Sequence, residues 1–403
     1  MSKAYLLFSA ESATQGKVPY KKETGVGGEV VFGDAPTGGG MHPEILVTAP
    51  TGSTVTVSNG GITLTATESS GTWAFTIPSF GTWTVSATKD TDSATESVSV
   101  TEVMQYTVEI HYVQTDLDDN DWDTISAVAR AGSGANYWSV GDCKQVALSG
   151  TCGTLSLSTT SYVYIIGFNH KGVDGITFQG FKTAETAGTD ICLVDANYDT
   201  AKSDGTKAFN MNHWGSGADP YNTNFGGWAG CDLRYDVLGS TDSAPTGYGA
   251  TPGSSRAGED ASNTTATSPV SNTLMSCLPA ALRAVMQPMT IYTDNVGTDD
   301  PSNHANHITA SVDYLPLLAE YEVFGERTDG NEYEQGYQSQ YAYYSAGNSK
   351  IKNKHNATGT AAKWWLRSPS IPTDTGFCHV STDGSISYHS SRSSYGLSPI
   401  FLV

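Results

Sequence analysis

The chain has 403 residues, 38% of them hydrophobic and 10% aromatic, which is enough for two or three domains that each bury a core. Its formal net charge of −20 at pH 7 would repel nucleic-acid phosphates and anionic lipid surfaces, so nucleic-acid binding is not expected. No apolar run reaches the roughly 18 residues of a membrane helix, and membrane insertion is not expected either. The 43 glycines favour β structure and long loops.

Residues 1–42 contain few large apolar side chains and several glycines, so this segment cannot bury a core of its own. We expect it to be a docking or oligomerisation segment, held by a partner or by neighbouring copies. The apolar run that follows Lys3 is short for a secretion signal. The six cysteines are widely spaced without a C-x-x-C pair, which favours buried free thiols over zinc ligation. A soluble protein folded in a reducing cytoplasm is therefore expected.

Residues 43–102 form short runs in which Val, Ile, Leu, Trp and Phe alternate with Thr and Ser, the period-two pattern of half-buried strands. Asn59-Gly60 is a tight hairpin signal. We expect a small immunoglobulin-like β-sandwich that acts as a rigid spacer. The predicted strands are 44–48, 54–58, 62–67, 72–77, 82–88 and 95–100, with Trp73, Phe75, Trp83 and Val85 in the core.

Residues 103–403 are expected to form one large α+β domain that begins with a strand at 106–112. Helices are predicted at 123–130, capped by Asp123, and at 278–286, with Pro279 in the first turn. A third predicted helix, 332–345, carries tyrosines at helical spacing, which we interpret as core packing rather than as a platform for a sugar. Long polar loops between about 199 and 271 contain scattered aromatic residues, interpreted as packing pins.

Two polar clusters are candidate metal sites. Asp119, Asp121 and Asp123 lie at alternate positions like the start of a calcium loop, but the central Gly and distal Glu are missing, so a turn that caps the next helix is favoured and calcium is the alternative. His304 and His307 have H-x-x-H spacing without a third ligand nearby, which favours a loop. No nucleophile elbow, phosphate loop or dinucleotide fingerprint occurs in the sequence.

The last forty residues combine two apolar anchors with a polar segment of Ser, Thr, Tyr, His, Asp and Gly, a composition typical of binding surfaces. Strands are predicted at 364–367, 377–381 and 385–388, with Asp383-Gly384 in the turn between the last two. The run 397–403 is apolar enough for a central strand of the same sheet. The stretches 370–376 and 387–395 should then emerge on one side of that sheet.

Several motifs occur in an order that resembles an uncharacterised domain common in phages and prophages of gut bacteria. They are Tyr137 to Asp142, Leu282 to Val285, Tyr341 to Tyr344, Trp364 to Pro369 and Phe377 to Gly384. The domain is similar to the C-type-lectin-like variable proteins of diversity-generating retroelements, and the resemblance covers about Tyr106 to Val403. An immunoglobulin-like sandwich followed by such a domain resembles the arrangement of tail-associated virion proteins.

The resemblance implies a mainly β protein with an α+β, C-type-lectin-like C-terminal domain, displayed on a virion assembled in the host cytoplasm. Residues 1–42 would contact phage structural proteins, the chain would form a homo-oligomer, and the C-terminal face would bind a host-cell or mucosal glycan or protein. Tyr388, Arg392 and Tyr395 are the expected hot spots, because aromatic residues and Arg dominate binding energy. The predicted ligand contacts are Ile371, Thr373, Asp374, His379, Ser387, Tyr388, His389, Arg392 and Tyr395.

In such systems, diversification at adenines cannot produce Lys, Glu, Gln, Met or Trp, and residues 368–403 contain none of these five. Two non-enzymatic alternatives stay open: a purely structural capsid or tail decoration protein, and a bacterial surface adhesin. The formylglycine-generating and related enzymes share the lectin-like fold, but their chemistry needs cysteines close together and only Cys378 falls near the proposed surface. We therefore expect neither catalysis nor a cofactor.

Overall fold

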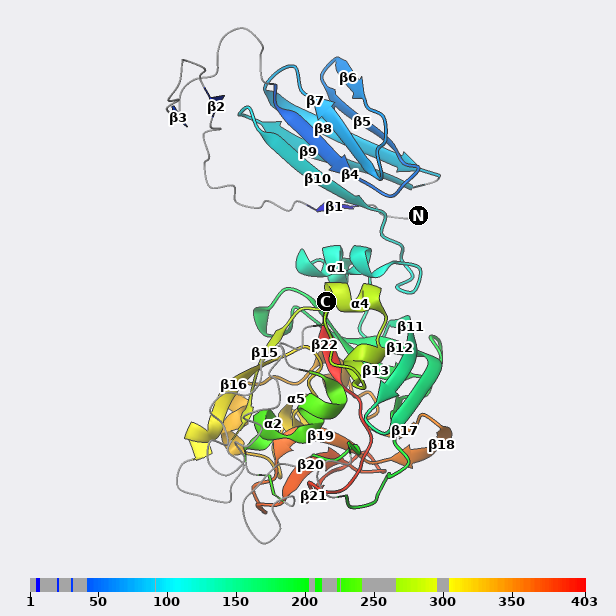
Figure 1. Ribbon diagram of the computed structural model, residues 1–403, viewed down its shortest axis with the longest axis vertical. Helices are drawn as coiled ribbons and strands as arrows, with labels where there is room; N and C mark the ends of the chain where they lie inside the picture. Colours follow the sequence, from blue (N-terminus) through cyan, green and yellow to red (C-terminus); the bar gives the residue numbers. More distant parts are fainter. Residues whose placement is uncertain are drawn as a thin grey trace. The chain divides into compact units, whose positions relative to one another are not determined.

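The computed structural model describes residues 42–90, 92–202, 207–211, 223–224, 226–240, 266–295 and 304–403, and three short strands before them. It divides into two compact units, Met1–Thr115 and Asp116–Val403 (Figure 1). The protein as a whole is mainly β, as predicted, and the second unit contains both strands and short helices. Among the described helices, none is long and apolar enough to cross a membrane.

The first unit contains two four-stranded sheets. One has the order β1-β10-β4-β7 and the other β6-β5-β8-β9. β10 and β4 are parallel, and the other neighbours are antiparallel. The strands are β1 (Tyr5–Leu7), β4 (Glu44–Thr48), β5 (Thr54–Asn59), β6 (Ile62–Thr65), β7 (Thr72–Thr76), β8 (Gly81–Lys89), β9 (Asp92–Val100) and β10 (Gln105–His111).

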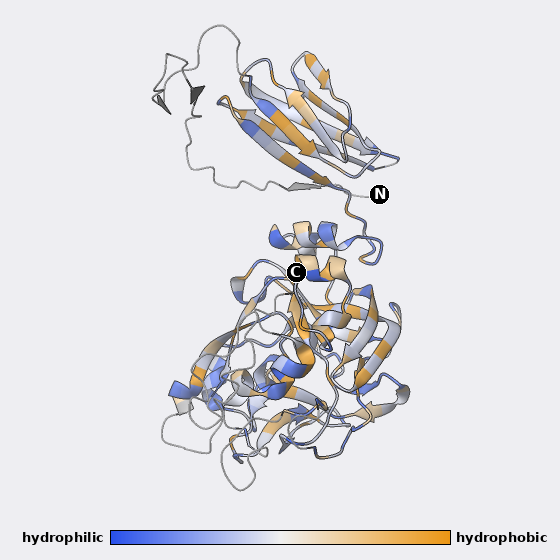
Figure 2. Ribbon diagram, in the orientation of Figure 1, coloured by the Kyte–Doolittle hydropathy of each residue, from blue (hydrophilic) through white to orange (hydrophobic). Residues whose placement is uncertain are grey.

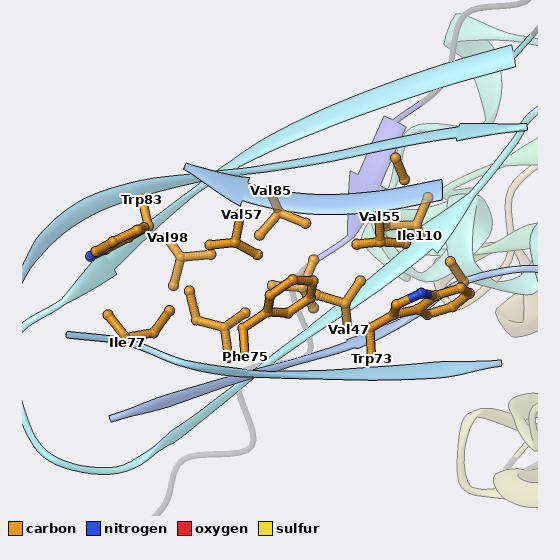
Figure 3. Packing of buried hydrophobic residues seen from close by; sticks show 14 of the residues in the cluster. Val47, Val55, Val57, Trp73, Phe75, Ile77, Trp83, Val85, Val98 and Ile110 are labelled. Carbon is orange, nitrogen blue, oxygen red and sulfur yellow. The ribbon is translucent and has the colours of Figure 1, made fainter. Parts of the chain in front are cut away.

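A single apolar core joins the two sheets of the first unit (Figure 3). Trp73 and Phe75 come from β7, Trp83 and Val85 come from β8, and all four are buried, which confirms the predicted core. Hydrophobic side chains recur along these strands (Figure 2) because alternate residues of a strand point to opposite faces. The six strands predicted between 44 and 100 are all present. The structure thus shows a two-sheet sandwich at this position.

The boundary between the units lies later than predicted. The sequence placed it after residue 102 and assigned the following strand to the C-terminal domain, but β10 pairs in parallel with β4 and belongs to the first unit. A strand's affiliation depends on its pairing partner, which local alternation does not reveal. Of the proposed docking segment 1–42, the described parts are His42, β1, β2 (Tyr20–Lys21) and β3 (Val30–Val31), and β1 pairs with β10. The remainder of that segment lies outside the described residues.

The largest sheet of the second unit has the order β11-β12-β13-β22 and is antiparallel throughout. Its strands are β11 (Cys143–Cys152), β12 (Leu155–Phe168), β13 (Ile176–Lys182) and β22 (Ile400–Leu402). The C-terminal run was predicted to be a central strand of the tail sheet, and that prediction is wrong. β22 is buried as expected, but it pairs with β13 at the edge of this other sheet.

Three smaller sheets complete the second unit. β14 (Ile191–Cys192) pairs with β17 (Lys352–Lys354), which pairs with β18 (Ala357–Ala362), and β15 (Met289–Asp294) pairs with β16 (Ile308–Asp313). The tail contributes an antiparallel sheet of the order β19-β20-β21. Its strands are β19 (Trp364–Pro369), β20 (Gly376–Val380) and β21 (Ile386–Ser390), as predicted from the sequence to within a few residues.

The helices of the second unit are short. α1 (Trp122–Arg130) and α4 (Ala280–Val285), which follows Pro279, are both present as predicted. The predicted cap is wrong, because Asp121 caps α1 and Asp123 lies in its first turn. The third is not a single helix, because it is divided into η6 (Glu332–Gly336) and α6 (Ala342–Ser345). The others are η1 (Gly134–Asn136), η2 (His170–Gly172), α2 (Gly227–Gly230), η3 (Leu233–Leu238), α3 (Leu274–Cys277), η5 (His304–His307) and α5 (Glu320–Phe324).

The division of that helix separates its tyrosines. Tyr341 and Tyr344 are buried in the core, as interpreted, whereas Tyr333 and Tyr337 are 46% and 43% exposed. The acidic cluster forms a turn in which the Asp121 side chain accepts a hydrogen bond from the backbone nitrogen of Thr124 at the start of α1. All six cysteines are free and buried.

Candidate functional site

The tail sheet has two different faces, which follow from its register. Trp365, His379 and Ser387 lie directly opposite one another on β19, β20 and β21. Directly paired residues point to the same side of a sheet. Burial decreases across this row, since Trp365 and His379 are buried and Ser387, on the edge strand, is half-buried. His389, opposite Phe377, lies on this same face and is exposed.

The other face of the tail sheet is part of the core. Trp364, Leu366, Cys378 and Val380 are fully buried there and belong to one apolar cluster. Tyr388 lies opposite Cys378 and therefore on this second face, but its position on the edge strand leaves it 39% exposed. Tyr388 and His389 are consecutive strand residues, so their side chains point to opposite faces.

Two predicted contacts are buried, and their assignment as surface contacts is corrected here. Tyr395 is 0% exposed and His379 is 3% exposed. Their rings lie 5.0 Å apart, and Tyr395 also packs 4.6 Å from Trp365. Tyr395 was expected to be a hot spot because tyrosine is common in binding surfaces, but here its apolar ring fills the space beside Trp365. Together these rings form the support beneath His389, whose ring lies 5.5 Å from Tyr395.

Burial sets the charge of this ring cluster. The pKa of His379 is lowered to about 3 by burial, with further contributions from Lys363 and His389. Burial and Lys363 also lower the pKa of His389. Both imidazoles are therefore neutral at neutral pH. Lys363 Nζ lies 3.1 Å from Asp199 Oδ1 and 3.3 Å from the Tyr395 hydroxyl, so the cation beside the cluster has a carboxylate partner.

The loop between β19 and β20 is held by one buried amide. The Nδ2 atom of Asn224 lies 2.8–3.0 Å from the carbonyl oxygens of Ser370, Thr373 and Gly376. The backbone nitrogen of Asn224 also donates to the carbonyl of Asp374 at 2.7 Å. Asn224 is completely buried. A single side chain far away in sequence therefore fixes the path of residues 370–376.

The loop after β21 is held in a comparable way by a buried carboxylate. Asp195 accepts hydrogen bonds from the Ser394 hydroxyl at 2.7 Å and from the Thr154 hydroxyl at 2.9 Å. The backbone of residues 199–202 completes the attachment. The backbone nitrogen of Asp199 donates to the carbonyl oxygen of Ser394, and that of Lys202 donates to the carbonyl oxygen of Arg392. Asp195 and the backbone of residues 199–202 thus fix the position of residues 391–394.

The other seven predicted contacts lie on the edge strand β21 or in the loops 371–375 and 391–394. We define the tail edge as β21 together with the loops 371–375 and 391–394. Asp374, Tyr388 and His389 are exposed on it, and Ile371, Thr373, Ser387 and Arg392 are half-buried. Seven of the nine residues predicted as ligand contacts are therefore accessible, and the two buried ones, His379 and Tyr395, pack beneath His389.

The tail edge offers hydrogen bonding and aromatic surface rather than reactive groups. Ser393 Oγ and His389 Nδ1 are 2.8 Å apart, which resembles half of a nucleophile–base pair, but Ser393 is only 5% exposed and positions the ring instead. Within the described ranges, there is no group of three or more His, Cys, Asp or Glu side chains arranged to hold a metal.

Comparison with known proteins adds a domain assignment to this geometry. Residues 260–403 match the model of a family described as a domain of unknown function, DUF6273. No curated protein and no solved structure matches the chain. The matched residues include the whole tail sheet and α5, and the description of the family names no biochemical activity.

The most distinctive motif of the matched segment, Trp364 to Pro369, is structural. Arg367 donates to both carboxylate oxygens of Glu322 at 2.6 Å, and all its contacts are buried. Burial alone would raise the pKa of Glu322, but Arg367 lowers it overall, so the pair is ionic. Ser368 donates to Glu334 at 2.6 Å. The motif therefore fixes α5 and η6 against the tail sheet.

Sequence reasoning missed the two side chains that organise the tail edge. Asn224 lies in a long polar segment, and Asp195 follows a short apolar strand. Asp195 also accepts a local hydrogen bond from Asn197 N, but the contacts that hold the tail edge join residues 146 and 199 positions apart, which no local pattern reveals. Their burial is the decisive property, because a buried polar group must be hydrogen-bonded and so reveals a specific structural role.

Proposed function

We propose that this chain is a phage virion surface protein, a tail fibre, head fibre or decoration protein, that binds a host-cell or mucosal surface ligand through the tail edge. Its C-terminal domain would be lectin-like and its sandwich immunoglobulin-like, as the sequence resemblance implies. Residues 1–42 would contact the particle, and multiple copies would raise avidity.

One observation carries this proposal. Exposed Tyr388 and His389 stand on an edge strand, and two loops at one end of the tail sheet, 370–376 and 391–394, are fixed by buried Asn224 and Asp195. Loops fixed before binding lose little conformational entropy when a ligand arrives, so even a polar surface can bind usefully. Aromatic residues on such a surface supply contact area with few rotatable bonds.

The proposal is tested by binding the fluorescently labelled full chain to intact gut bacteria and to mucin-coated surfaces. We expect the Tyr388→Ala and His389→Ala double variant to bind at least ten times more weakly, since the two rings are the exposed aromatic groups of the edge. Tyr333→Ala is the matched control, because Tyr333 is a comparably exposed tyrosine outside the tail edge. Equal binding by all three proteins would refute the assignment and favour a purely structural decoration role.

The single variants separate the two faces. Because Tyr388 and His389 point to opposite sides of β21, a ligand on the face of the ring cluster depends on His389, and one that wraps the edge depends on both. Asn224→Ala removes no exposed group but releases three carbonyls of the 370–376 loop. We expect it to weaken binding several-fold, with faster dissociation, if the fixed loop matters.

A further inference from the structure

A cavity of about 380 Å³ lies in the second unit, away from the tail edge. Its volume is near the lower end of the range of about 300–1,000 Å³ for small-molecule sites. It is lined by η2, β13, β15, α5, β22 and the segment after η6, with His170, Tyr292, Glu322, Tyr337, Gln338 and Tyr341 among its residues. None of these residues belongs to the surface proposed above.

Aromatic rings form the walls of this cavity. Tyr292 and Tyr337 are stacked with ring centroids 4.9 Å apart, and both remain more than one third exposed. Deeper inside, buried Tyr341 stacks on His170 at 3.8 Å. A Cβ at position 167 would lie 3.1 Å from the Tyr341 ring, so Gly167 leaves room for this arrangement. The apolar surface of this exposed tyrosine pair is unfavourable in water, so a bound ligand that covers it would be stabilised.

Gln338 presents a hydrogen-bond acceptor at the cavity. Its Nε2 donates to the carbonyl of Tyr292 at 2.9 Å, and because a carbonyl can only accept, the amide orientation is fixed. Oε1 is thereby left buried, with no hydrogen-bond partner in the described part of the chain. Gln338 is 6% exposed. A buried acceptor without a partner costs free energy, so the site favours a molecule that supplies a donor.

His170 presents a second acceptor. Burial lowers its pKa and outweighs the opposing effects of Glu322 and of the Ser339 backbone, so the ring is neutral. A neutral imidazole has one donor and one acceptor nitrogen. Nε2 is buried and has no partner among the described residues, and with the proton on Nδ1 it is the acceptor. Two buried acceptors and two aromatic surfaces thus belong to residues that line one cavity.

The charges at the cavity are largely balanced. Glu322, at its wall, is held by both terminal nitrogens of Arg367 and by the backbone nitrogen of Ala319. Its carboxylate therefore needs no further cation. Lys171 also lines the cavity but is exposed to solvent. This balance argues against a strongly charged ligand.

We propose that this cavity binds a single neutral sugar unit, whose C–H face stacks on Tyr337 and whose hydroxyl groups donate to Gln338 Oε1 and His170 Nε2 once these two side chains turn toward the cavity. A sugar ring combines several hydroxyl donors in different directions with an apolar face, which is the chemistry that this lining offers. A nucleobase would match the aromatic walls, but its few donors lie in the plane of the ring. The site is independent of the tail edge and does not require it to function.

The test uses the full chain and a panel of methyl glycosides of glucose, galactose, mannose, fucose and N-acetylglucosamine, with 9-methyladenine as the nucleobase for comparison. Saturation-transfer NMR detects binding, and titration gives the dissociation constant, expected to be about 1 mM for so small a ligand. We expect at least one glycoside to bind and 9-methyladenine not to compete with it. Tyr337→Ala and His170→Phe should each weaken binding at least tenfold.

Matched variants locate the effect. His170→Phe keeps a ring stacked on Tyr341 but removes the acceptor. A loss of binding in this variant is therefore caused by the missing hydrogen bond and not by changed packing. Tyr333→Ala removes a similarly exposed tyrosine from η6, which ends one residue before Tyr337, without touching the cavity, and should bind like the unchanged protein. The Tyr388→Ala and His389→Ala double variant should also bind normally. The proposal is overturned if no glycoside binds, if 9-methyladenine binds more tightly than all of them, or if Tyr337→Ala and His170→Phe leave binding unchanged.

Discussion

The two units are stabilised by different kinds of interior. In the first, both sheets contribute to a core of Val, Ile, Ala, Trp and Phe. In the second, ionised side chains are buried as well, including the pair of Arg367 with Glu322 and that of Arg234 with Asp313. Apolar packing responds to substitution in proportion to the volume removed, whereas a buried charge that loses its partner is strongly unfavourable. The units should therefore differ in how they respond to substitution and to pH.

The largest expected effect comes from Arg367→Met. It leaves Glu322 buried without its bidentate partner, and removing one member of a buried pair destabilises proteins by about 3–5 kcal/mol. Hydrogen exchange measured by mass spectrometry on the full chain resolves peptides of both units. Protection should fall across α5 and the tail sheet and stay unchanged in β4–β9.

The companion variant adds Glu322→Leu to Arg367→Met. Since an apolar replacement of both partners is often neutral, the double variant should recover most of the lost protection. A loss of less than 1 kcal/mol in the single variant would show that the pair is dispensable, and the contrast between the two interiors would then fail.

A second, somewhat smaller effect depends on pH. Burial raises the pKa of Glu334 from 4.5 to about 7, a change worth about 3 kcal/mol. Between these two values the folded state binds more protons than the unfolded state, so this group's contribution to stability is complete below pH 4.5 and is lost as the pH rises through 7. Glu334→Gln lacks this dependence. Relative to the unchanged protein, it should gain about 3 kcal/mol between pH 4.5 and pH 8 in urea unfolding.

The neighbouring carboxylate provides the control for this measurement. Glu332 lies on the same 3-10 helix, but its side chain is 55% exposed. Glu332→Gln should therefore leave the pH profile of unfolding unchanged. If both variants shift the profile equally, the burial of Glu334 is not the cause.

The same contrast explains what the sequence could predict. The strands of the sandwich and its four named core residues follow from alternation, because period two encodes which face is buried. The tail strands follow from short apolar runs and from the Asp383-Gly384 turn, and β19 and β20 are buried at every position. The pairing of β10 with β4 and of β22 with β13 does not, since register and partner depend on tertiary contacts. Tyr395 was misplaced for a related reason. A tyrosine suits both a binding surface and a core, and only its position beside Trp365 decides between them.

Some of the residues proposed to bind a ligand could be predicted from the sequence, and others could not. The exposed positions of the tail edge follow from composition and turn signals. The roles of Asn224 and Asp195, and of Gln338 and His170 at the cavity, were not predicted, because they depend on segments that are distant in the chain. Tyr337 was recognised as part of a tyrosine series, but the break between η6 and α6 that exposes it was not.

The smallest expected effect tests the apolar interior of the first unit. Ile45 on β4 is completely buried in the sandwich core, and Ile45→Val removes one methylene group while keeping the branched shape that suits a strand. Substitutions of this type cost about 0.5–1.5 kcal/mol. No titratable group takes part in the change, so the cost should be equal at pH 5 and pH 8. Hydrogen exchange at both pH values should show reduced protection in β4, β7 and β10 alone. A cost that varied with pH would mean that the stability of the sandwich is coupled to the buried charges of the second unit.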